Sequence, residues 1–380
     1  MRKKIAFVVQ MIGMGGTEGF VYNVAKGLSP DEYDISVIVA LSENCRDLFQ
    51  RKRKAFEALG ARIIWAGEIG TFPKGWLNFA KRLADIISFH GPFDIIHSNM
   101  DLINAVVLAV ARRAGVKKRI AHAHNCGSQA MLTARIWKKI LFKVYRQITR
   151  DMILFCATDL CGCSDLALNF AYGNRASKRG IIVLNGIDQD RFQKFEVEHN
   201  YISKELSRPE KKKYVISVGR VCMMKNPEFA LEVIMELRKI RDDFDFLWVG
   251  LNVYEENMMR EMRRRHIEDC VCFTGERHDI PELLNCADVL LMPSVFEGFG
   301  FTLVEAQATH TPCIASSAVT SLTNCGLCEY IEIKGDDAAK KWAQSINHVL
   351  NDKKDRVPDE RINRFRIEHT VNQMNKIYNN

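Results

Sequence analysis

The sequence predicts an α/β protein made of two Rossmann-like domains that face each other across a cleft. Three observations support this fold class. The chain has 380 residues, which is longer than a single hydrophobic core usually grows. Apolar runs of strand length alternate with helix-length segments of 3.6-residue periodicity, as in βαβ units with a parallel sheet. This alternation occurs twice, and a charged stretch without periodicity at 189–213 separates the two series.

The first series predicts an N-terminal domain over residues 1–188. Its expected strands are Ile5–Val9, Ile35–Leu41, Arg62–Trp65, Asp94–His97, Arg119–Ala123, Asp159–Cys163 and Ile181–Leu184. Its expected helices lie near Glu18–Leu28, Arg46–Leu59, Trp76–His90, Leu102–Ala114, Ala134–Arg150 and Ser164–Tyr172. Because parallel sheets bind ligands at the carboxyl ends of their strands, we looked for functional motifs directly after these runs.

The second series predicts a C-terminal domain over residues 214–358, after a linker at 189–213 that contains Pro209. Its expected strands are Tyr214–Val218, Phe244–Val249, Val271–Phe273, Val289–Met292 and Cys313–Ala315. Two closing helices are expected at Asp336–Leu350 and Asp359–Tyr378. The second, within 359–380, is expected to pack back toward the N-terminal domain and is too polar to be expected in a core.

Composition excludes several classes of protein. An apolar content of 47% excludes a disordered chain, and no apolar run reaches the length of a membrane-spanning helix. Twelve scattered cysteines without a secretion signal indicate reduced thiols and a cytoplasmic protein. Cys325-Gly-Leu-Cys328 has the spacing of half a zinc site or of a redox motif, but buried or loop thiols are the favoured interpretation. The net charge of +8 favours anionic partners only mildly, and we expect no nucleic acid among them.

Three segments that follow expected strands have the composition of ligand-binding turns. Gly13-Met-Gly-Gly-Thr-Glu18 can bring backbone amides and a helix N-terminus close to a phosphate or sugar, although a tight turn without a ligand explains it equally well. Arg220 and Lys225 follow the strand Tyr214–Val218 and could bind a diphosphate, or lie in a solvated loop.

The third segment, 293–308, is the most informative. It reads Pro-Ser-Val-Phe-Glu297-Gly-Phe-Gly-Phe-Thr-Leu-Val-Glu305-Ala-Gln-Ala and passes from a glycine-rich turn into a helix. Either glutamate alone could be an acidic residue favoured by a helix N-terminus. The whole string predicts a sugar-nucleotide site in which one carboxylate lies near the sugar and the other accepts hydrogen bonds from ribose hydroxyls.

With these motifs in this order, the chain resembles family 4 of the retaining glycosyltransferases, which have the GT-B fold, over essentially its full length. The matching segments include Gly-Gly-Thr-Glu near the start, Ile95-Ile-His-Ser, Asn185-Gly-Ile-Asp188 and Phe273-Thr-Gly-Glu-Arg277. Within the family, Arg119-Ile-Ala-His-Ala-His-Asn and Glu305-Ala-Gln-Ala are most similar to the capsular and exopolysaccharide branch.

The resemblance implies roles for the matching positions. Arg220 and Lys225 would hold the donor diphosphate, Glu305 the ribose hydroxyls, and Glu297 the transferred sugar. The other donor-binding positions act through the backbone or close approach, and they are Gly15, Gly16, Glu276, Arg277, Gly298, Phe299 and Gly300.

Three histidines need separate comment. His124 matches the active-site histidine of the family, whereas His122 lies on the same face of the expected strand but deeper. A third, His310, stands where the family usually has glycine in a left-handed helix cap, which puts local stability in doubt more than the chemistry.

The resemblance also implies a function. We expect a retaining enzyme of the hexosyltransferase type that uses a nucleotide-diphosphate sugar, with UDP as the nucleotide, and a lipid-linked saccharide acceptor in cell-surface polysaccharide synthesis. We expect no cofactor and no metal, because Asp188-Gln-Asp190 and Asp243-Phe-Asp245 read as a turn and a strand start. A nucleotide-sugar epimerase and a non-catalytic sugar-nucleotide binder stay open as alternatives.

Residues 135–150 combine an apolar stripe with six basic residues. Such a helix can lie on an anionic membrane, which would place the protein peripherally at the inner face of the cell membrane. The alternative is an ordinary domain helix whose stripe packs on the sheet.

Overall fold

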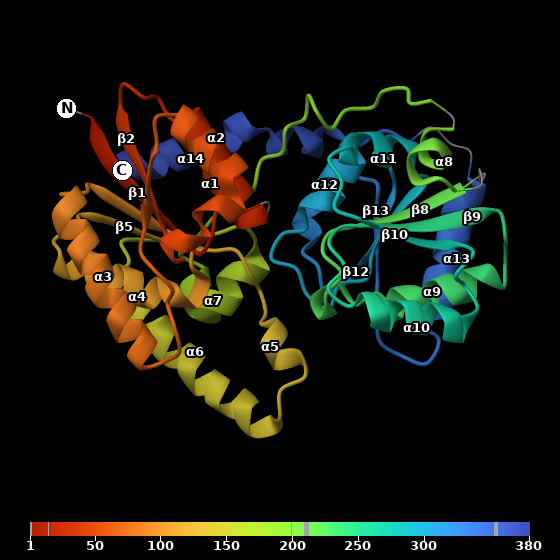
Figure 1. Ribbon diagram of the computed structural model, residues 1–380, viewed down its shortest axis with the longest axis horizontal. Helices are drawn as coiled ribbons and strands as arrows, with labels where there is room; N and C mark the ends of the chain where they lie inside the picture. The colour runs from red at the N-terminus through yellow and green to blue at the C-terminus, as the bar shows by residue number, and fades with distance from the viewer. Residues whose placement is uncertain (1, 14, 199, 209–212, 353–355) are drawn as a thin grey trace. The chain divides into compact units, whose positions relative to one another are not determined.

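A computed structural model describes residues 2–13, 15–198, 200–208, 213–352 and 356–380. The chain divides into two compact units, the first formed by Met1–Gly186 with Ile367–Asn380 and the second by Ile187–Arg366. Each unit has its own parallel sheet with helices packed on it, so each is a Rossmann-like α/β domain (Figure 1).

The sheet of the first unit has, within the described ranges, seven parallel strands in the order β3-β2-β1-β4-β5-β6-β7. They are β1 (Lys3–Val9), β2 (Tyr33–Val39), β3 (Arg62–Trp65), β4 (Ile95–Ser98), β5 (Lys118–Ala123), β6 (Asp159–Gly162) and β7 (Ile181–Ile182). The strand order reverses between β1 and β4. Sheets of this kind bind ligands at the carboxyl ends of the strands next to such a reversal.

The helices of the first unit are α1 (Gly16–Gly27), α2 (Gln50–Ala58), α3 (Lys74–His90), α4 (Asn104–Arg113), α5 (Gln129–Leu132), α6 (Ile136–Cys156), α7 (Asp165–Ser177) and α14 (Ile367–Asn379). Two short 3-10 helices, η1 (Glu43–Phe49) and η2 (Asp101–Ile103), precede α2 and α4. Helices α1 and α14 approach closely, since a Cβ atom on Gly27 would lie 2.4 Å from Cγ2 of Val371.

The expectation that the last helix is too polar for a core is wrong. Helix α14 buries Val371, Met374, Ile377 and Tyr378, and the last three belong to the same apolar cluster as the strands β1 and β2. These residues recur at spacings of three and four, so one face of the helix is apolar although its overall composition is polar.

Within the described residues, the sheet of the second unit has six parallel strands in the order β10-β9-β8-β11-β12-β13. They are β8 (Lys213–Val218), β9 (Phe244–Val249), β10 (Val271–Gly275), β11 (Val289–Met292), β12 (Cys313–Ser316) and β13 (Cys328–Ile331). The sequence did not predict β13. The order reverses between β8 and β11, so the corresponding ligand position lies after these two strands.

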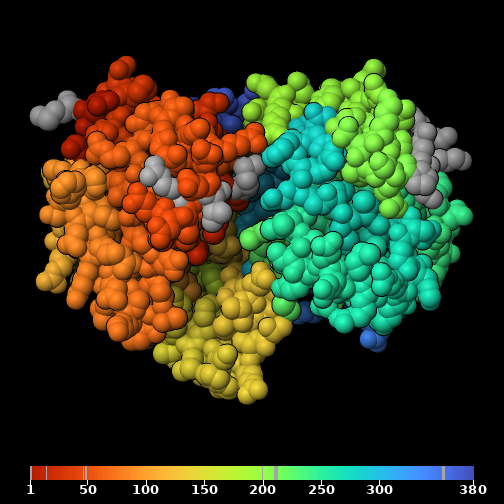
Figure 2. All heavy atoms as spheres, in the orientation of Figure 1, coloured from red at the N-terminus to blue at the C-terminus, as the bar shows by residue number. Residues whose placement is uncertain are grey.

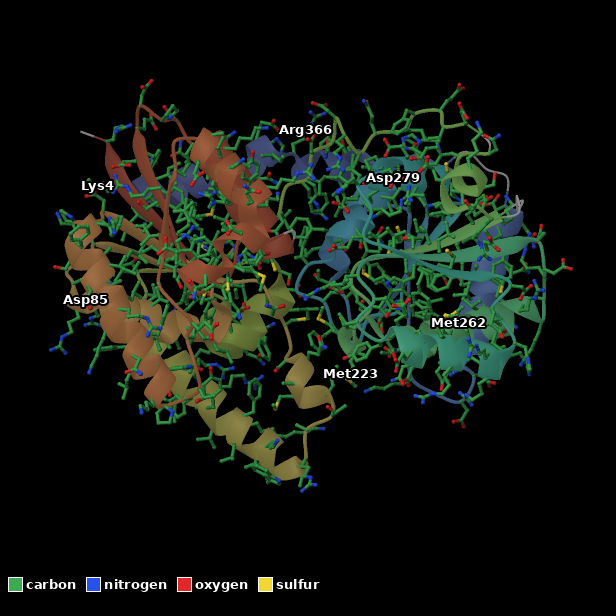
Figure 3. All side chains as sticks on the ribbon, viewed as in Figure 1. Lys4, Asp85, Met223, Met262, Asp279 and Arg366 are labelled. Atoms are coloured by element: carbon green, nitrogen blue, oxygen red, sulfur yellow. The ribbon has the colours of Figure 1, made fainter. Side chains whose placement is uncertain are left out.

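The helices of the second unit are α8 (Tyr201–Leu206), α9 (Pro227–Arg238), α10 (Glu255–Arg265), α11 (Ile280–Cys286), α12 (Phe301–Ala308) and α13 (Ala338–Asn351), with the 3-10 helices η3 (Met223–Lys225), η4 (Ser321–Thr323) and η5 (Glu360–Phe365). Trp248 of β9 and Trp342 of α13 are fully buried in one apolar cluster. Met262 of α10, labelled in Figure 3, belongs to the same cluster.

The segment 189–213, expected as a linker, instead belongs to the second unit. The Tyr201 hydroxyl donates to Asp279 at 2.8 Å, and Arg208 forms an ion pair at 2.8 Å with the fully buried carboxylate of Asp245. A buried carboxylate needs a partner, and this charged segment supplies it. Pro209 lies outside the described residues.

The chain crosses between the units twice, and the two crossings are adjacent. Ile187 forms a β-bridge with Arg366, and its amide donates to the carbonyl of Phe365 at 2.8 Å. A Cβ atom on Gly186 would lie 2.6 Å from Cα of Ile367, so only glycine fits there. This close approach explains the glycine of the Asn-Gly-Ile-Asp motif.

His310 lies just after α12 and has a φ of 64°, in the left-handed region. The expectation of a left-handed cap at this position is therefore confirmed. Histidine adopts this region less readily than glycine but more readily than a β-branched residue.

Candidate functional site

An ion pair lies at the point where the strand order of the second sheet reverses. Nζ of Lys225, which ends η3 after β8, is 2.6 Å from Oε1 of Glu297, which follows β11. Both side chains are largely buried, with 16% and 11% exposed. A cation and a carboxylate held together at this edge are positioned to contact an anionic ligand and its hydroxyl groups.

The loops that carry this pair are tied together. The Ser294 hydroxyl donates to Oε1 of Glu297 at 3.0 Å, and the amide of Val295 donates to the carbonyl of Met224 at 2.8 Å. A small hollow at the ends of β8 and β11 is lined by residues that include Lys225 and Ser294. The sequence analysis did not single out Ser294, although its place three residues before Glu297 is a usual spacing for a local side-chain bond.

Glu305 lies in the first turns of α12, and burial raises the pKa of its carboxyl to about 7. The positive charges of Arg191 and Lys225 oppose this shift. Arg191 was not among the expected site residues because it falls in the segment read as a linker. Its guanidinium is exposed and donates to the carbonyl of His278 at 2.9 Å, which holds it in the second unit.

The glycine-rich turn 298–300 leads directly into α12. Gly300 has a φ of 86° and occupies the N-cap position, with no side chain capping the helix. Phe299 is buried against Phe301 and Phe365. The amides at this helix start can donate to a phosphate, which is the role that the family resemblance implies for Phe299 and Gly300.

Arg220 and Arg277 differ in whether their side chains form ion pairs with other residues. The side chain of Arg220 is exposed, and within the described part of the chain no ion pair is formed by it. Arg277, in contrast, is held by Asp279 at 2.6 Å and by Glu205 at 2.9 Å, so its side chain ties α8 to the sheet. The commitment of the Arg277 side chain is compatible with the base contact through the backbone that the family resemblance implies near Glu276 and Arg277.

In the first unit, Gly15 and Gly16 lie directly after the end of β1, at the start of α1. Gly15 is the N-cap residue, and the Glu18 carboxylate lies against it, since a Cβ atom on Gly15 would lie 2.3 Å from Oε2 of Glu18. Both glycines are exposed at the start of α1.

His124 belongs to a buried chain of aromatic side chains on β4 and β5. The Tyr378 hydroxyl lies 2.7 Å from Nδ1 of His97, and Nε2 of His97 lies 3.0 Å from Nδ1 of His122. The ring of His122 stacks on that of His124 with centroids 4.4 Å apart. The sequence analysis did not connect His97 or Tyr378 with His124, since they come from distant segments of the chain.

This series of hydrogen bonds links the tautomers of His97 and His122. A neutral imidazole has one donor and one acceptor nitrogen. When the Tyr378 hydroxyl donates to His97, Nε2 of His97 donates to His122, and the proton of His122 is then on Nε2. Among the residues that the structure describes, this nitrogen has no hydrogen-bond partner.

The environment of His124 keeps its imidazole neutral. Burial lowers its pKa to about 3 and that of His97 to about 3, so neither ring carries a charge near neutral pH. Nε2 of His124 contacts Oδ1 of Asn99 at 2.9 Å, and the His124 amide donates to Asp101 at 2.8 Å. Its Nδ1 is buried and has no partner in the described part of the chain, and as the unprotonated nitrogen of a neutral ring it is a hydrogen-bond acceptor.

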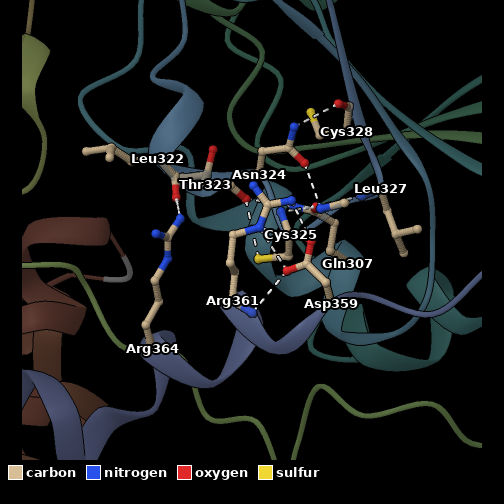
Figure 4. A network of polar contacts seen from close by, with 11 residues as sticks. Gln307, Leu322, Thr323, Asn324, Cys325, Leu327, Cys328, Asp359, Arg361 and Arg364 are labelled. Carbon is tan, nitrogen blue, oxygen red and sulfur yellow. Dashed lines mark hydrogen bonds and ion pairs between the residues drawn. The ribbon is translucent and has the colours of Figure 1, made fainter.

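The Cys-x-x-Cys pair belongs to a structural network around Gln307 of α12 (Figure 4). Oε1 of Gln307 accepts from the amide of Cys325 at 2.7 Å, and its Nε2 donates to the carbonyl of Thr323 at 2.8 Å. Burial raises the pKa of Cys325 to about 11 and that of Cys328 to about 12. Both are therefore protonated thiols at neutral pH, which suits neither a metal ligand nor a redox nucleophile.

The aspartates of Asp243-Phe-Asp245 each pair with an arginine. Asp245 binds Arg208, as described above, and Asp243 forms an ion pair with Arg241 at 2.7 Å. Among the described residues, no group of three or more His, Cys, Asp or Glu side chains could hold a metal ion.

The expected site residues thus form two groups. The first unit holds His124 with the glycines at the start of α1. The second unit holds Lys225, Glu297 and Glu305 together, and Arg191 joins them.

Comparison with known proteins gives a consistent picture. Residues 199–362 match the family described as "Glycosyl transferases group 1". The chain is 26% identical over 347 residues to the "Putative glycosyltransferase EpsF" of Bacillus subtilis (strain 168), covering 91% of this chain and 87% of that protein. It is 23% identical to an Escherichia coli "UDP-Gal:alpha-D-GlcNAc-diphosphoundecaprenol alpha-1,3-galactosyltransferase", covering 83% of this chain and 79% of the other.

Among solved structures, the fold is similar to that of Anabaena Alr3699/HepE, crystallised in complex with UDP and glucose. The TM-score is 0.77 at 17% identity, and 99% of each chain is covered. A further structure of that protein contains UDP-glucose.

Proposed function

We propose that this chain is a retaining enzyme that uses a nucleotide-diphosphate sugar. It belongs to the group 1 glycosyltransferases of the GT-B fold, in the capsular and exopolysaccharide branch. The acceptor is a growing, lipid-linked polysaccharide at the inner face of the cell membrane. The observation that carries this proposal is the ion pair of Lys225 and Glu297, with Glu305 close to Lys225, at the strand reversal of the second sheet.

The departing diphosphate requires positive charge and backbone donors. Lys225 supplies a largely buried ammonium, and the uncapped start of α12 supplies amides. The exposed Arg220 adds a guanidinium that can fork onto phosphate oxygens. Charge that is already in place costs no reorganisation when the leaving group becomes more negative in the transition state.

The sugar and ribose hydroxyls require acceptors. Glu297 is held by Lys225 and Ser294, which fixes its carboxylate for a contact with the transferred sugar. Glu305 accepts hydrogen bonds from the ribose. Because its pKa is about 7 without a ligand, donor binding is expected to favour the ionised form and to release a proton.

His124 acts as a neutral hydrogen-bonding group. With a pKa of about 3 it cannot hold a second proton at physiological pH, so it does not serve as a cation. A sugar hydroxyl that reaches its buried, unpartnered Nδ1 would donate a hydrogen bond to it. In a retaining reaction the acceptor oxygen arrives on the face that the nucleotide leaves, and a leaving phosphate oxygen takes the acceptor proton.

Two similar proteins suggest the substrates. The E. coli relative is named for UDP-Gal and a diphosphoundecaprenol-linked acceptor, and HepE was crystallised with UDP and UDP-glucose. We therefore propose a UDP-sugar as donor and a diphosphate-lipid-linked saccharide as acceptor.

A panel of UDP-, GDP- and ADP-sugars, each with and without a diphosphoundecaprenol-linked saccharide, tests the proposal. We expect nucleoside diphosphate release that depends on the acceptor with one donor, and the H1–H2 coupling of the product by NMR should show the anomeric configuration of the donor. An inverted product would refute retention. Conversion of the donor to an epimer without acceptor would identify an epimerase, and tight donor binding without turnover would identify a non-catalytic binder.

A further inference from the structure

Helix α6 exposes an apolar stripe over its N-terminal half. The residues of this stripe are between 51% and 73% exposed, and they are Ile136, Trp137, Ile140, Leu141, Val144 and Ile148. Within the described ranges, no helix is long and apolar enough to cross a membrane. An exposed stripe of this size needs a partner, because large contiguous apolar patches are uncommon on free surfaces.

The stripe is not the face by which α6 packs on its own domain. The buried residues of this helix are Thr149, Ile153 and Cys156, and α6 packs against α4. At about 100° per residue, these positions lie roughly 140° around the helix from the centre of the stripe. The interpretation of residues 135–150 as an ordinary helix whose stripe covers the sheet is therefore wrong. The yellow atoms of α6 stand at the surface of the first unit in Figure 2.

Basic side chains lie on the same helix but off the stripe. Arg135, Lys138, Lys139 and Lys143 are exposed, and Arg146 and Arg150 follow on the same helix. At about 100° per residue, these positions lie roughly 100° to 180° around the helix from the centre of the stripe. Asp151 is the single acidic residue in 135–151. A helix with an apolar face and a basic polar face has the composition that binds anionic lipid surfaces.

Aromatic rings extend the apolar surface beyond α6. Trp137 is 51% exposed, and Nζ of Lys138 lies 5.5 Å from the centroid of its ring. Phe72, before α3, is 64% exposed, and its ring centroid is 6.2 Å from that of Tyr145. Exposed tryptophan with a neighbouring lysine is typical of side chains at the level of lipid headgroups.

We propose that this surface docks on an anionic membrane, with the apolar stripe among the outer acyl segments and the basic residues at the lipid phosphates. The proposal deepens the proposed function and rests on it for its purpose, since a lipid-linked acceptor is presented at a membrane. A second copy of this chain fits the surface less well. A symmetric contact through the stripe would bring together two α6 helices that, over 135–151, each carry six basic residues and one acidic residue.

The test is co-sedimentation of the full chain with vesicles, without donor or acceptor. One vesicle is pure phosphatidylcholine and the other contains about 30% phosphatidylglycerol, an anionic lipid. We expect binding to the anionic vesicle at low salt and a decrease of at least about tenfold at high salt. Binding to neither vesicle, or equal binding to both at every salt concentration, would overturn the proposal.

Two variants separate the charged and apolar contributions. Lys138→Glu/Lys139→Glu/Lys143→Glu should weaken binding to anionic vesicles by at least about tenfold. The control triple Lys26→Glu/Arg51→Glu/Lys54→Glu removes the same charge from exposed positions on α1 and α2, and should bind like the native chain. If both triples lose binding equally, net charge and not this surface is responsible, and the proposal fails.

The apolar variant is Ile140→Ser/Leu141→Ser, which should also lose binding while keeping its thermal unfolding midpoint, because both residues are already exposed. Analytical ultracentrifugation tests whether a second copy of this chain occupies the stripe instead. A dimer of the native chain that dissociates in this variant would assign the stripe to a second copy and refute membrane docking. Calorimetry with the donor identified above separates the two proposals, because the basic triple should bind the donor normally whether or not it binds vesicles.

Discussion

Replacement of Glu305 by glutamine should make the free protein more stable while weakening its hold on the donor. The pKa of Glu305 is raised from its usual value of 4.5 to about 7, mainly by burial. Below pH 4.5 the carboxyl is neutral in both folded and unfolded chains, so folding carries no cost from it. Above about pH 7 it is ionised in both states, and the folded state bears the full cost of the buried charge.

The size of this cost follows from the pKa difference. One pKa unit corresponds to about 1.4 kcal/mol, so a shift from 4.5 to about 7 corresponds to about 3 kcal/mol at about pH 8.5. Near pH 5.5 the carboxyl of the folded chain is mostly protonated, and the cost is only about 1 kcal/mol. Because glutamine is neutral at every pH, Glu305→Gln should gain these amounts.

Urea unfolding measures both values. Tryptophan fluorescence follows both units, since Trp65, Trp76 and Trp137 lie in the first and Trp248 and Trp342 are buried in the second. The midpoint of Glu305→Gln should exceed that of the native chain by a clearly larger margin at the higher pH. A margin that is the same at both pH values, or a variant that is less stable at the higher pH, would refute the assigned environment of Glu305.

The affinity for the donor should rise as the pH rises through the pKa of Glu305. If only the ionised carboxylate accepts the ribose hydrogen bonds, affinity in the native chain rises about tenfold between about pH 6 and about pH 8. The imidazoles of His124 and His97 stay neutral over this range, because burial lowers the pKa of each to about 3. Glu305→Gln should bind weakly and without this rise, and calorimetry in two buffers should detect no proton release.

Other changes give simpler tests. Arg220→Ala should weaken donor binding more than tenfold in calorimetry, because a charge-assisted hydrogen bond contributes about 1.5–3 kcal/mol; unchanged affinity would remove Arg220 from the site. Turnover should persist in excess chelator, and full loss that manganese restores would show that a metal is required. Tyr378→Phe leaves Nδ1 of His97 without its partner and should lower the unfolding free energy by about 1–3 kcal/mol in urea titration, whereas no change would mean that the hydroxyl is not needed there. His310→Val should be about 1–2 kcal/mol less stable than His310→Gly, since φ is 64° at this position; equal stability would contradict the left-handed cap.

Periodicity predicted most of the two sheets because parallel strands buried on both faces are continuous apolar runs. The run Ile5–Val9 in β1 and the run Val289–Met292 in β11 are examples. Strand β13, Cys328–Ile331, was missed because it is short, lies at the sheet edge and contains an exposed glutamate. Edge strands bury less of their surface and therefore have a weaker pattern.

The site was predictable where its residues follow a strand in the sequence and not where tertiary packing brings them in. Lys225 and Glu297 follow β8 and β11, and their ion pair is the result of the strand order. Arg191 approaches Glu305 only because the segment 189–213 folds onto the second unit. Its charged composition is the same whether its side chains are solvated or paired, so the sequence alone could not distinguish the two cases.

The two adjacent crossings make the second unit an insertion within the first. On the ribosome, residues 187–366 are complete before α14 has been synthesised, so the second unit can fold while the first unit still lacks part of its core. The Tyr378 hydroxyl that sets the tautomer of His97 arrives among the last residues of α14. A nascent chain can therefore assemble its anion-binding groups early, but it cannot order the histidines until synthesis has passed residue 378.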